Sequence, residues 1–387
     1  MPTTQIIVIG GGYAGVLAAN RVLQRADVEV ALVNPRPEFV ERIRLHQLVA
    51  GNDDAVADYS AVLSPRVRLI VDSAEQIDAD ARKVMLASGS ALAYDHLIYA
   101  VGSTAGVPAS VPGAAEFAYP LGELEAARRL ATRMAALTPS APIVVVGGGL
   151  TGIEAAAEFA ENGRAVTLIT DVLGPSLAKA GRRSVAKRLH KLGVDIVENS
   201  PVAAITADHV TLADGREVPA EVTVWTAGFG VPTLAVASGL ATDAQGRLVT
   251  DETLTSVSHP SIVAAGDAAA PSALPLRMSC QLAMPLAAQA ADTVLAHIEG
   301  GQPRVLNPAS VGQCISLGRH AGTIQLSRFD DTAIGLHIGG RLAATIKESV
   351  CAGTLNFLAK EARKPGSYFW PRGGKRAEHL AARSVQP

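Results

Sequence analysis

Two short glycine-rich segments have the residue types and spacing that bind a dinucleotide. They are GGGYAG at residues 10–15 and GGGLTG at residues 147–152, and both match the pattern GxGxxG. In this pattern the first glycine allows a tight turn, the second lets the backbone approach a pyrophosphate, and the third lets a helix pack against a strand. One match is a weak signal, but two matches in one chain predict two bound dinucleotides.

A ribose-binding side chain is expected about 20 residues after each glycine loop. Asn34 stands there in the first module and Asp171 in the second. An amide can bond to ribose hydroxyls, and a carboxylate accepts from a 2′-hydroxyl but repels a 2′-phosphate. Asp171 therefore favours NADH over NADPH. Arg182 and Arg183 follow soon after and are either a solvated helix face or cations that reverse this preference, so NADPH stays open.

Two further carboxylates stand where they could do chemistry. Asp267 follows Gly266 at the end of the apolar segment 262–265, where it could bind a flavin ribityl hydroxyl or serve only as a turn residue or helix cap. Glu154 comes just after the second loop, in the first turn of a predicted helix. There it is placed to transfer a proton, or only to stabilise the helix dipole by ~0.3–1 kcal/mol.

The rest of the composition excludes several functions. Cys280, Cys314 and Cys351 form no CxxC pair, so we expect reduced thiols and neither a disulfide redox centre nor a metal site. The net charge of -2 at pH 7, without a run of like charges, gives no reason to expect a nucleic acid partner. No stretch approaches the ~20 apolar residues of a membrane-spanning helix, and the N-terminus does not read as a signal peptide. We therefore expect a cytoplasmic protein.

Each glycine loop lies between an apolar strand and a helix, and a second apolar strand follows, as in a parallel α/β sheet. The first unit is expected at residues 5–10, 13–25 and 28–33, and the second at residues 142–147, 150–162 and 165–169. The other expected elements are strands at 96–101, 218–228, 261–266, 313–317 and 322–326, an antiparallel excursion over 67–91, a helix over 277–298 entered near Pro285, a helix over 354–363, and a loose tail after Lys375.

Six motifs follow one another along the chain: IIVIGGGYAG (6–15), FVERIRLHQLVAG (39–51), YDHLIYAVGS (94–103), IVVVGGGLTGIEAAAEFAE (143–161), VTVWTAGF (222–229) and SIVAAGDAA (261–269). Together they resemble the two-dinucleotide-binding flavoproteins, most closely the type II NADH:quinone oxidoreductases and the apoptosis-inducing-factor-like NADH dehydrogenases. The resemblance implies an α/β fold with two Rossmann-like domains of the glutathione-reductase type. An NAD(P)H-binding domain (113–239) would be inserted into a split FAD-binding domain (1–112 and 240–304), and a small α+β C-terminal domain (305–387) would follow, as a dimer or membrane-surface contact.

The resemblance also implies residue roles. FAD would be bound by Gly10, Gly12, Tyr13, Ala14, Gly15, Asn34, Arg42, Gly102, Gly266, Asp267 and Ala283. NAD(P)H would be bound by Gly147, Gly149, Leu150, Thr151, Gly152, Asp171 and Gly228. Glu154 would be catalytic, as a proton relay beside the flavin and the nicotinamide. Arg42 and Arg44 would either face the flavin or be plain surface residues.

The electron acceptor depends on a motif that this chain matches only in part. Quinone enzymes of the family carry AQxAxQ, and residues 280–285 here read CQLAMP, so Gln281 and Ala283 match but Cys280 and Pro285 do not. We expect Gln281 and Pro285 on the acceptor side. The segment RIRLHQ (42–47) stands where related disulfide reductases carry a cysteine pair, which excludes disulfide reduction.

Three hypotheses for the second half of the reaction stay open. The first is a quinone-like small acceptor, the second is a redox protein such as a ferredoxin, and the third is an NAD(P)H-sensing flavoprotein with little turnover. A homodimer, and peripheral contact with the inner face of a membrane through residues 354–370, are compatible with each of them.

Overall fold

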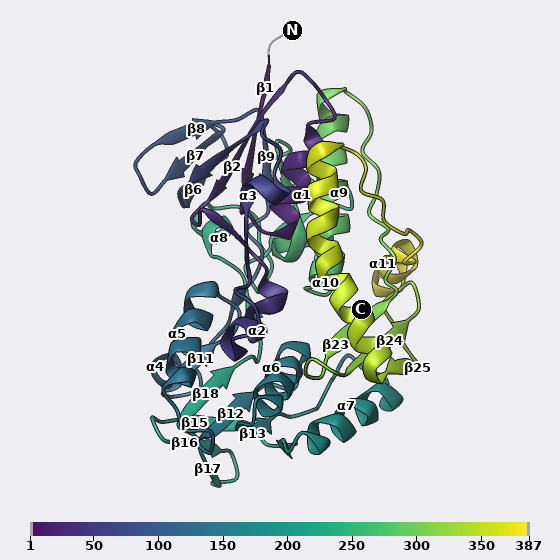
Figure 1. The fold of residues 1–387 in the computed structure, drawn as a ribbon. Helices are drawn as coiled ribbons and strands as arrows, with labels where there is room; N and C mark the ends of the chain where they lie inside the picture. Colours follow the sequence, from purple (N-terminus) through teal and green to yellow (C-terminus); the bar gives the residue numbers. More distant parts are fainter. Residues whose placement is uncertain (1–2, 385–387) are drawn as a thin grey trace.

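The computed structural model describes residues 3–384, and its first parallel sheet draws strands from distant parts of the chain (Figure 1). The strand order is β21-β9-β1-β2-β5, and all neighbouring strands are parallel. The strands are β1 (Thr4–Ile9), β2 (Val28–Asn34), β5 (Val67–Val71), β9 (His96–Tyr99) and β21 (Ile262–Ala264). Their Val, Ile and Leu runs are largely buried, as a sheet covered on both faces requires.

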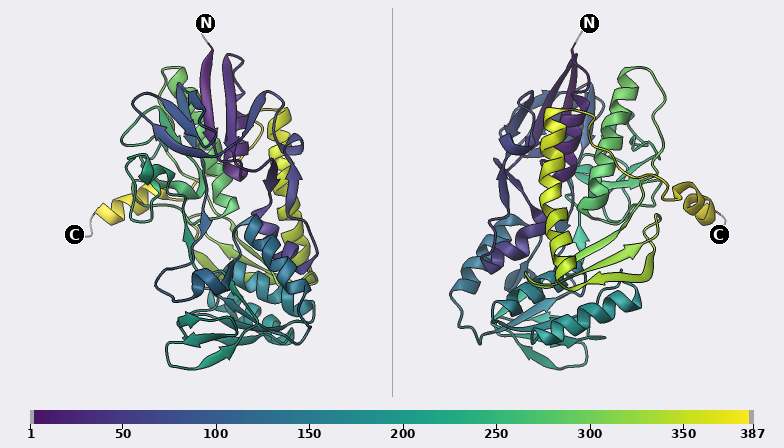
Figure 2. Two further views of the ribbon diagram at one scale, coloured as in Figure 1. Left: turned by 90° about the vertical axis from the view of Figure 1, so that its left-hand side faces the viewer. Right: turned by 45° about the vertical axis from the view of Figure 1, so that its right-hand side comes forward.

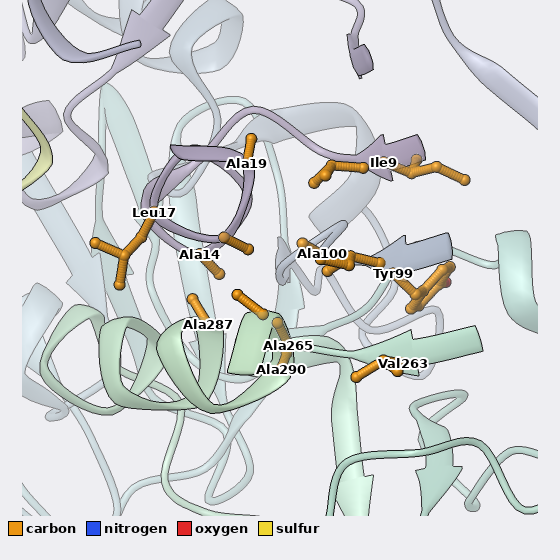
Figure 3. Close-up of a cluster of buried hydrophobic side chains, with 14 of the residues drawn as sticks. Ile9, Ala14, Leu17, Ala19, Tyr99, Ala100, Val263, Ala265, Ala287 and Ala290 are labelled. Carbon is orange, nitrogen blue, oxygen red and sulfur yellow. The ribbon is translucent and has the colours of Figure 1, made fainter. Parts of the chain in front are cut away.

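Two helices from the two ends of this domain lie side by side against the sheet. They are α1 (Tyr13–Val22), which follows the first glycine loop, and α9 (Cys280–Ile298). Figure 3 shows Ala14 and Leu17 of α1 close to Ala287 of α9, all of them buried. Because alanines let the helices approach closely, the start of α9 comes next to the first glycine loop.

The second parallel sheet has the strand order β11-β18-β12-β13-β14. Its strands are β11 (Ala118–Pro120), β12 (Pro142–Val146), β13 (Ala165–Ile169), β14 (Asp195–Val197) and β18 (Val222–Trp225), and its helices are α5 (Leu124–Ala135), α6 (Leu150–Glu161) and α7 (Lys179–Lys191). The chain enters and leaves this domain side by side, because β10 (Thr104–Ala105) pairs with β19 (Phe229–Gly230). Leu234 and Ala235 already belong to the core of the first domain.

The C-terminal part joins the two domains along one side. An antiparallel sheet of β23 (Gly312–Ser316), β24 (Gly322–Ser327) and β25 (Ala333–Gly339) is followed by α10 (Gly340–Arg363), which runs back along the first domain (Figures 1 and 2). Arg21 of α1 fixes this arrangement, since its guanidinium lies 2.7 Å from Asp292 and 3.3 Å from the fully buried Glu361. Among residues 3–384, no helix is long and apolar enough to cross a membrane.

Smaller elements complete the fold. The remaining strands are β3 (Glu38–Val40), β4 (Val56–Asp58), β6 (Ala74–Asp78), β7 (Lys83–Leu86), β8 (Ala91–Ala93), β15 (Val202–Ile205), β16 (His209–Leu212), β17 (Glu217–Pro219), β20 (Leu248–Thr250) and β22 (Ala269–Pro271). The remaining helices are η1 (Arg42–Arg44), α2 (Leu45–Ala50), α3 (Tyr59–Val62), α4 (Ala114–Phe117), α8 (Leu234–Ala237), η2 (Gly266–Ala268) and α11 (Arg376–Ser384).

Three expectations about the first domain need correction. Helix α1 ends at Val22 rather than at residue 25, where the Arg25 guanidinium turns to Asp27 at 2.9 and 2.6 Å. The antiparallel excursion begins only at Ala74, because residues 67–71 are a strand of the parallel sheet. Helix α9 begins at Cys280, capped by the Ser279 hydroxyl that accepts from the Leu282 amide, so Pro285 lies inside the helix.

Two expectations about the C-terminal part also need correction. The helix predicted over residues 354–363 is the end of α10, which begins at Gly340. The tail after Lys375 forms α11 rather than a loose segment. Arg376 anchors it, since the guanidinium donates to both carboxylate oxygens of Glu252 at 2.9 Å and to the Pro271 carbonyl at 2.8 Å. Figure 2 shows α11 projecting from the side of the molecule.

Candidate active site

A large cleft lies between the two parallel sheets and the C-terminal part. Its volume is about 1620 Å³, whereas a pocket for one small ligand measures ~300–1,000 Å³. Many of the predicted site residues line it: Gly10, Gly12, Tyr13, Ala14, Asn34, Arg42, Gly102, Leu150, Thr151, Glu154, Gly266, Asp267, Gln281 and Ala283. The first glycine loop and Leu150 and Thr151 of the second loop therefore line one space, which is large enough for more than one ligand, whereas Gly147 and Gly149 do not line it.

The glycines of the two loops have two structural roles: some allow close packing of helix and strand, and others leave open space at the start of a helix. A side chain at Gly15 would collide with the carbonyl oxygen of Gly10, and one at Gly152 would collide with that of Gly147. These two glycines let the helix lie close to the strand, and they do not line the cleft. A side chain at Gly12 or Gly149 would meet no described atom within 4 Å, and these residues begin α1 and α6. Each helix therefore has open space at its N-terminus, where free N–H groups attract a pyrophosphate.

The ends of β2 and β13 carry side chains that are bonded to the loops. The Asn34 amide oxygen accepts from the Gly11 amide at 3.0 Å, and the Thr170 hydroxyl accepts from the Gly148 amide at 3.0 Å. Each side chain also donates to the carbonyl two residues further along. Thr170 is thus the counterpart of Asn34, and Asp171 lies one residue later, exposed and outside the cleft wall.

A chain of polar contacts crosses the floor of the first module. The Arg42 guanidinium donates to the Gly122 carbonyl at 2.9 Å and to the Ser103 hydroxyl at 3.0 Å. The Ser103 hydroxyl in turn donates to the Asp267 carboxylate at 2.7 Å. All four residues line the cleft. The second oxygen of Asp267 has no hydrogen bond to another described residue, which leaves an acceptor free for a ligand hydroxyl.

Arg44, in contrast, faces the protein rather than the cleft. It is buried, and its guanidinium lies 2.6 Å from Glu348 and 3.4 Å from Glu41. These carboxylates outweigh the effect of burial and raise the pKa of Arg44. Arg44 therefore ties η1 to α10, and of the two arginines only Arg42 lies in the cleft wall.

Glu154 and Lys347 form a buried ion pair in the cleft wall. The Lys347 Nζ lies 3.0 Å from Glu154 Oε1, which also accepts from the Ser316 amide at 2.9 Å. Burial alone raises the pKa of Glu154, but the ammonium beside it outweighs burial and holds the pKa below its ordinary value. Burial alone would lower the pKa of Lys347. The Glu154 carboxylate beside it has the larger, opposite effect, so the pKa of Lys347 is raised. The pair is therefore ionised at neutral pH.

His46 of α2 lies close to this pair and lines the cleft. It is 3% exposed, and its Nε2 has no hydrogen-bond partner among residues 3–384. Burial lowers the pKa of His46 to about 4. The imidazole is therefore neutral at pH 7, with an unused ring nitrogen.

The start of α9 supplies polar groups to the part of the cleft that is bordered by the C-terminal part of the chain. Gln281 lines the cleft, whereas Pro285 is buried inside α9. Because Pro285 has no N–H, the carbonyl of Gln281 lacks its usual partner one turn along the helix. Cys280 and Cys314 also line the cleft, and burial raises the pKa of Cys280 to about 11, so its thiol is protonated. Apolar side chains from the C-terminal part complete this end: Val311, Ile324, Leu326, Ile338 and Ile346.

Several of these residues carried no usable sequence signal. Lys347 is one charge among many along α10, and only the return of that helix past α6 brings it to Glu154. His46 and Ser103 fall inside the quoted motifs, but their neighbours come from other elements. Thr170 could have been identified from the sequence, because it directly follows the largely apolar run 165–169 as Asn34 follows the largely apolar run 28–33. The strand register agrees, since Val146 pairs with Ile169 as Ile9 pairs with Val33. Gly228 turns the chain with a φ of 81° and lies outside the cleft wall.

The chain is similar to known proteins over most of its length. The sequence pattern of the family described as pyridine nucleotide-disulphide oxidoreductase matches residues 4–293. An NADH dehydrogenase-like protein of Mycobacterium tuberculosis is 32% identical over 302 residues, which are 69% of this chain and 73% of that protein. A type II NADH:quinone oxidoreductase of the same organism is 26% identical over 351 residues, 79% of this chain and 75% of that protein.

The fold also matches solved structures. The sulfide:quinone oxidoreductase of Aquifex aeolicus superposes with a TM-score of 0.79 at 20% identity, over 99% of this chain and 96% of that chain. At this identity the match concerns the fold alone. It confirms the expected α/β architecture with two Rossmann-like domains.

Proposed function

Since the chain belongs to the pyridine nucleotide-disulphide oxidoreductase family, we propose that it is an FAD-dependent NADH dehydrogenase that passes electrons to a quinone. The observation that carries this function is the shared cleft. The first glycine loop, Leu150 and Thr151 of the second loop and the apolar C-terminal wall line the same space, so a nicotinamide donor and an acceptor can reach one flavin.

The first module has the residues to hold FAD. The open N-terminus of α1 at Gly12 suits the pyrophosphate, and Asn34 stands at the ribose position. Asp267 has a free carboxylate oxygen for a ribityl hydroxyl, and Ser103 and Arg42 hold that carboxylate in place. When bound, FAD supplies the chemistry of accepting a hydride and releasing an electron pair.

The second module has the residues to hold NADH. Gly149 leaves open space at the N-terminus of α6, and Leu150 and Thr151 of the same turn face the cleft. Glu154, on the next turn, is kept ionised by Lys347 and lies where the two modules meet. These residues would orient the nicotinamide toward the first module, and such orientation of the reactants would supply most of the rate.

The C-terminal part suits a small apolar acceptor. Ile324, Leu326 and Ile346 provide an apolar wall, and Gln281 and Lys347 are the polar groups beside it. An apolar pocket with a few polar groups is what a quinone ring requires. Exposed apolar side chains nearby, Leu336, Leu342 and Phe357, support a peripheral membrane contact or a homodimer as part of the proposal.

The function is tested with the purified protein. It must be yellow, and its denatured supernatant must contain FAD rather than FMN; a colourless protein contradicts the whole assignment. The NADH-reduced flavin is then mixed in stopped flow with a quinone, a ferredoxin or dioxygen. Fastest reoxidation by the quinone supports the proposal, fastest reoxidation by ferredoxin assigns a protein acceptor, and very slow reoxidation by all three assigns an NADH sensor.

A further inference from the structure

Helix α6 carries three glutamates on one face. Glu154, Glu158 and Glu161 follow one another at intervals of four and three residues, which places them on the same side of a helix. Glu154 lies in the cleft, Glu158 is 1% exposed, and the Glu161 side chain is 19% exposed. This acidic face of α6 leads from the cleft toward the surface.

Glu158 is an unusual member of this face. One carboxylate oxygen accepts from the Asn52 side chain at 2.6 Å and lies 3.8 Å from the Arg319 guanidinium. The other oxygen is buried and has no hydrogen-bond partner among residues 3–384. Burial raises the pKa of Glu158, and the charges of Glu161 and Glu154 raise it further, while Asn52 and Arg319 oppose them.

Glu154 and Glu158 therefore differ in their affinity for a proton, although they are one helical turn apart. The pKa of Glu154 is lowered by Lys347, and that of Glu158 is raised by burial. Neighbouring carboxyls whose pKa values are pushed apart are typical of sites where one group stores a proton and the other passes it on.

The proposed function creates a need for such a proton, and the inference rests on that function. Reduction of a quinone to a quinol takes two electrons and two protons. The hydride of NADH brings the electron pair and one hydrogen, so one proton must come from solvent. Glu154 and Lys347 are both largely buried, and solvent reaches them poorly.

We propose that Glu158 stores this proton and passes it to the cleft through Glu154. The O–H bond of the Glu158 carboxyl breaks as one forms on Glu154, and Glu154 gives the proton to the acceptor oxygen as the acceptor takes the electron pair. The Glu158 carboxylate then takes a proton from solvent past the exposed Asn52 and the partly exposed Arg319. No electrons pass through α6.

The test is Glu158→Gln in the FAD-loaded protein. Glutamine keeps the volume and the acceptor for Asn52, but it carries no transferable proton. Reduction by NADH should keep the wild-type rate. Reoxidation by a short-chain benzoquinone, followed together with proton uptake by a pH indicator dye, should slow by roughly 100-fold. The wild-type rate should fall as pH rises through the raised pKa of Glu158, and the variant should lose this dependence.

A matched control distinguishes a proton relay through Glu158 from the mere loss of a negative charge near Arg319. Glu348→Gln removes a carboxylate that lies 3.2 Å from the same Arg319 without touching Glu158. Its reoxidation should match the wild type, with the same pH profile. If Glu158→Gln instead matches the wild type in both rate and pH profile, the relay is wrong and the proposed function stands. If the wild type is reduced by NADH but no quinone reoxidises it, the proposed function fails first.

The infrared spectrum reports whether the Glu158 carboxyl is protonated, and it does so without enzyme turnover. A buried, protonated carboxyl has a carbonyl stretch separate from those of ionised carboxylates. This band should be present in the wild type and in Glu348→Gln, and absent in Glu158→Gln. A wild-type spectrum without the band contradicts proton storage at Glu158.

Discussion

Asn34 and Thr170 make the same pair of hydrogen bonds in the two nucleotide-binding modules. Each accepts from the amide of the second loop glycine at 3.0 Å and donates to the carbonyl two residues further along, at 2.8 Å from Asn34 and 3.1 Å from Thr170. Both side chains therefore hold the shape of their loop from the end of the neighbouring strand. Neither module has a carboxylate at this position, so loop shape is fixed by a neutral group.

Thr170→Val removes the hydroxyl from the second loop and leaves the Gly148 amide without its partner. A buried amide left unpaired costs ~1–3 kcal/mol, and the loop that receives the NADH pyrophosphate loses its support. We expect the KM for NADH to rise about tenfold with kcat nearly unchanged and FAD content intact. Steady-state kinetics and the flavin absorbance measure this. Thr170→Ser keeps the hydroxyl and should behave as the wild type.

Asp171→Ala tests the remaining acid near the ribose position. A carboxylate that bonds a 2′-hydroxyl favours NADH and repels the phosphate of NADPH. We expect kcat/KM for NADH to fall by about tenfold and that for NADPH to change less or to rise. An equal loss with both donors would remove Asp171 from the ribose and leave it as an exposed surface residue.

Gly12→Ala and Gly149→Ala form a matched pair. A methyl group at either position enters open space, so the fold should hold, but it occupies the N-terminal end of a helix where a pyrophosphate would lie. We expect Gly12→Ala to purify with little or no FAD. Gly149→Ala should keep its FAD and show a raised KM for NADH. Flavin content and circular dichroism check both variants, and loss of FAD from Gly149→Ala would contradict the assignment of the two loops.

Most of the fold was predictable because the signal is local. An apolar strand, a glycine loop and a helix follow one another within about 30 residues in each module, and the structure has both units within a few residues of their predicted bounds. Element ends were less predictable, since side chains from elsewhere decide them. Arg376 fixes α11 through Glu252, more than a hundred residues away in the chain.

The site was predictable where its residues belong to short sequence motifs. Gly10, Asp267 and Glu154 belong to short motifs, and the structure brings all three into the cleft wall. Lys347 and His46 have no motif, because their roles come from the return of α10 past α6 and from burial beside Glu154. A contact made by a distant helix leaves no periodic trace in the sequence.

Replacing Lys347 and replacing Glu154 should each break their ion pair, but the two variants should differ in folding stability and turnover. Lys347→Met leaves the Glu154 carboxylate buried without its cation, which costs ~3–5 kcal/mol of folding stability. Glu154→Gln should keep flavin content and slow turnover. The double variant Glu154→Gln, Lys347→Met should recover most of the stability lost in Lys347→Met. Urea unfolding of all four proteins measures the coupling, and additive losses would show that the two residues do not interact.

His46 should make folding stability depend on pH. The ordinary pKa of 6.5 is lowered to about 4 by burial, so below pH 6.5 the unfolded chain binds a proton that the folded protein refuses. Stability should therefore fall as pH drops from 6.5 to about 4, by about 3 kcal/mol in total. His46→Gln has no such group, and its stability should fall less over the same window. Urea unfolding midpoints across that range measure the difference.

His190→Gln, on the exposed end of α7, is the control and should follow the wild type. Identical pH profiles for the wild type and His46→Gln would mean that the buried imidazole takes up a proton in the folded protein as readily as in the unfolded chain, which would require a polar partner for its free ring nitrogen.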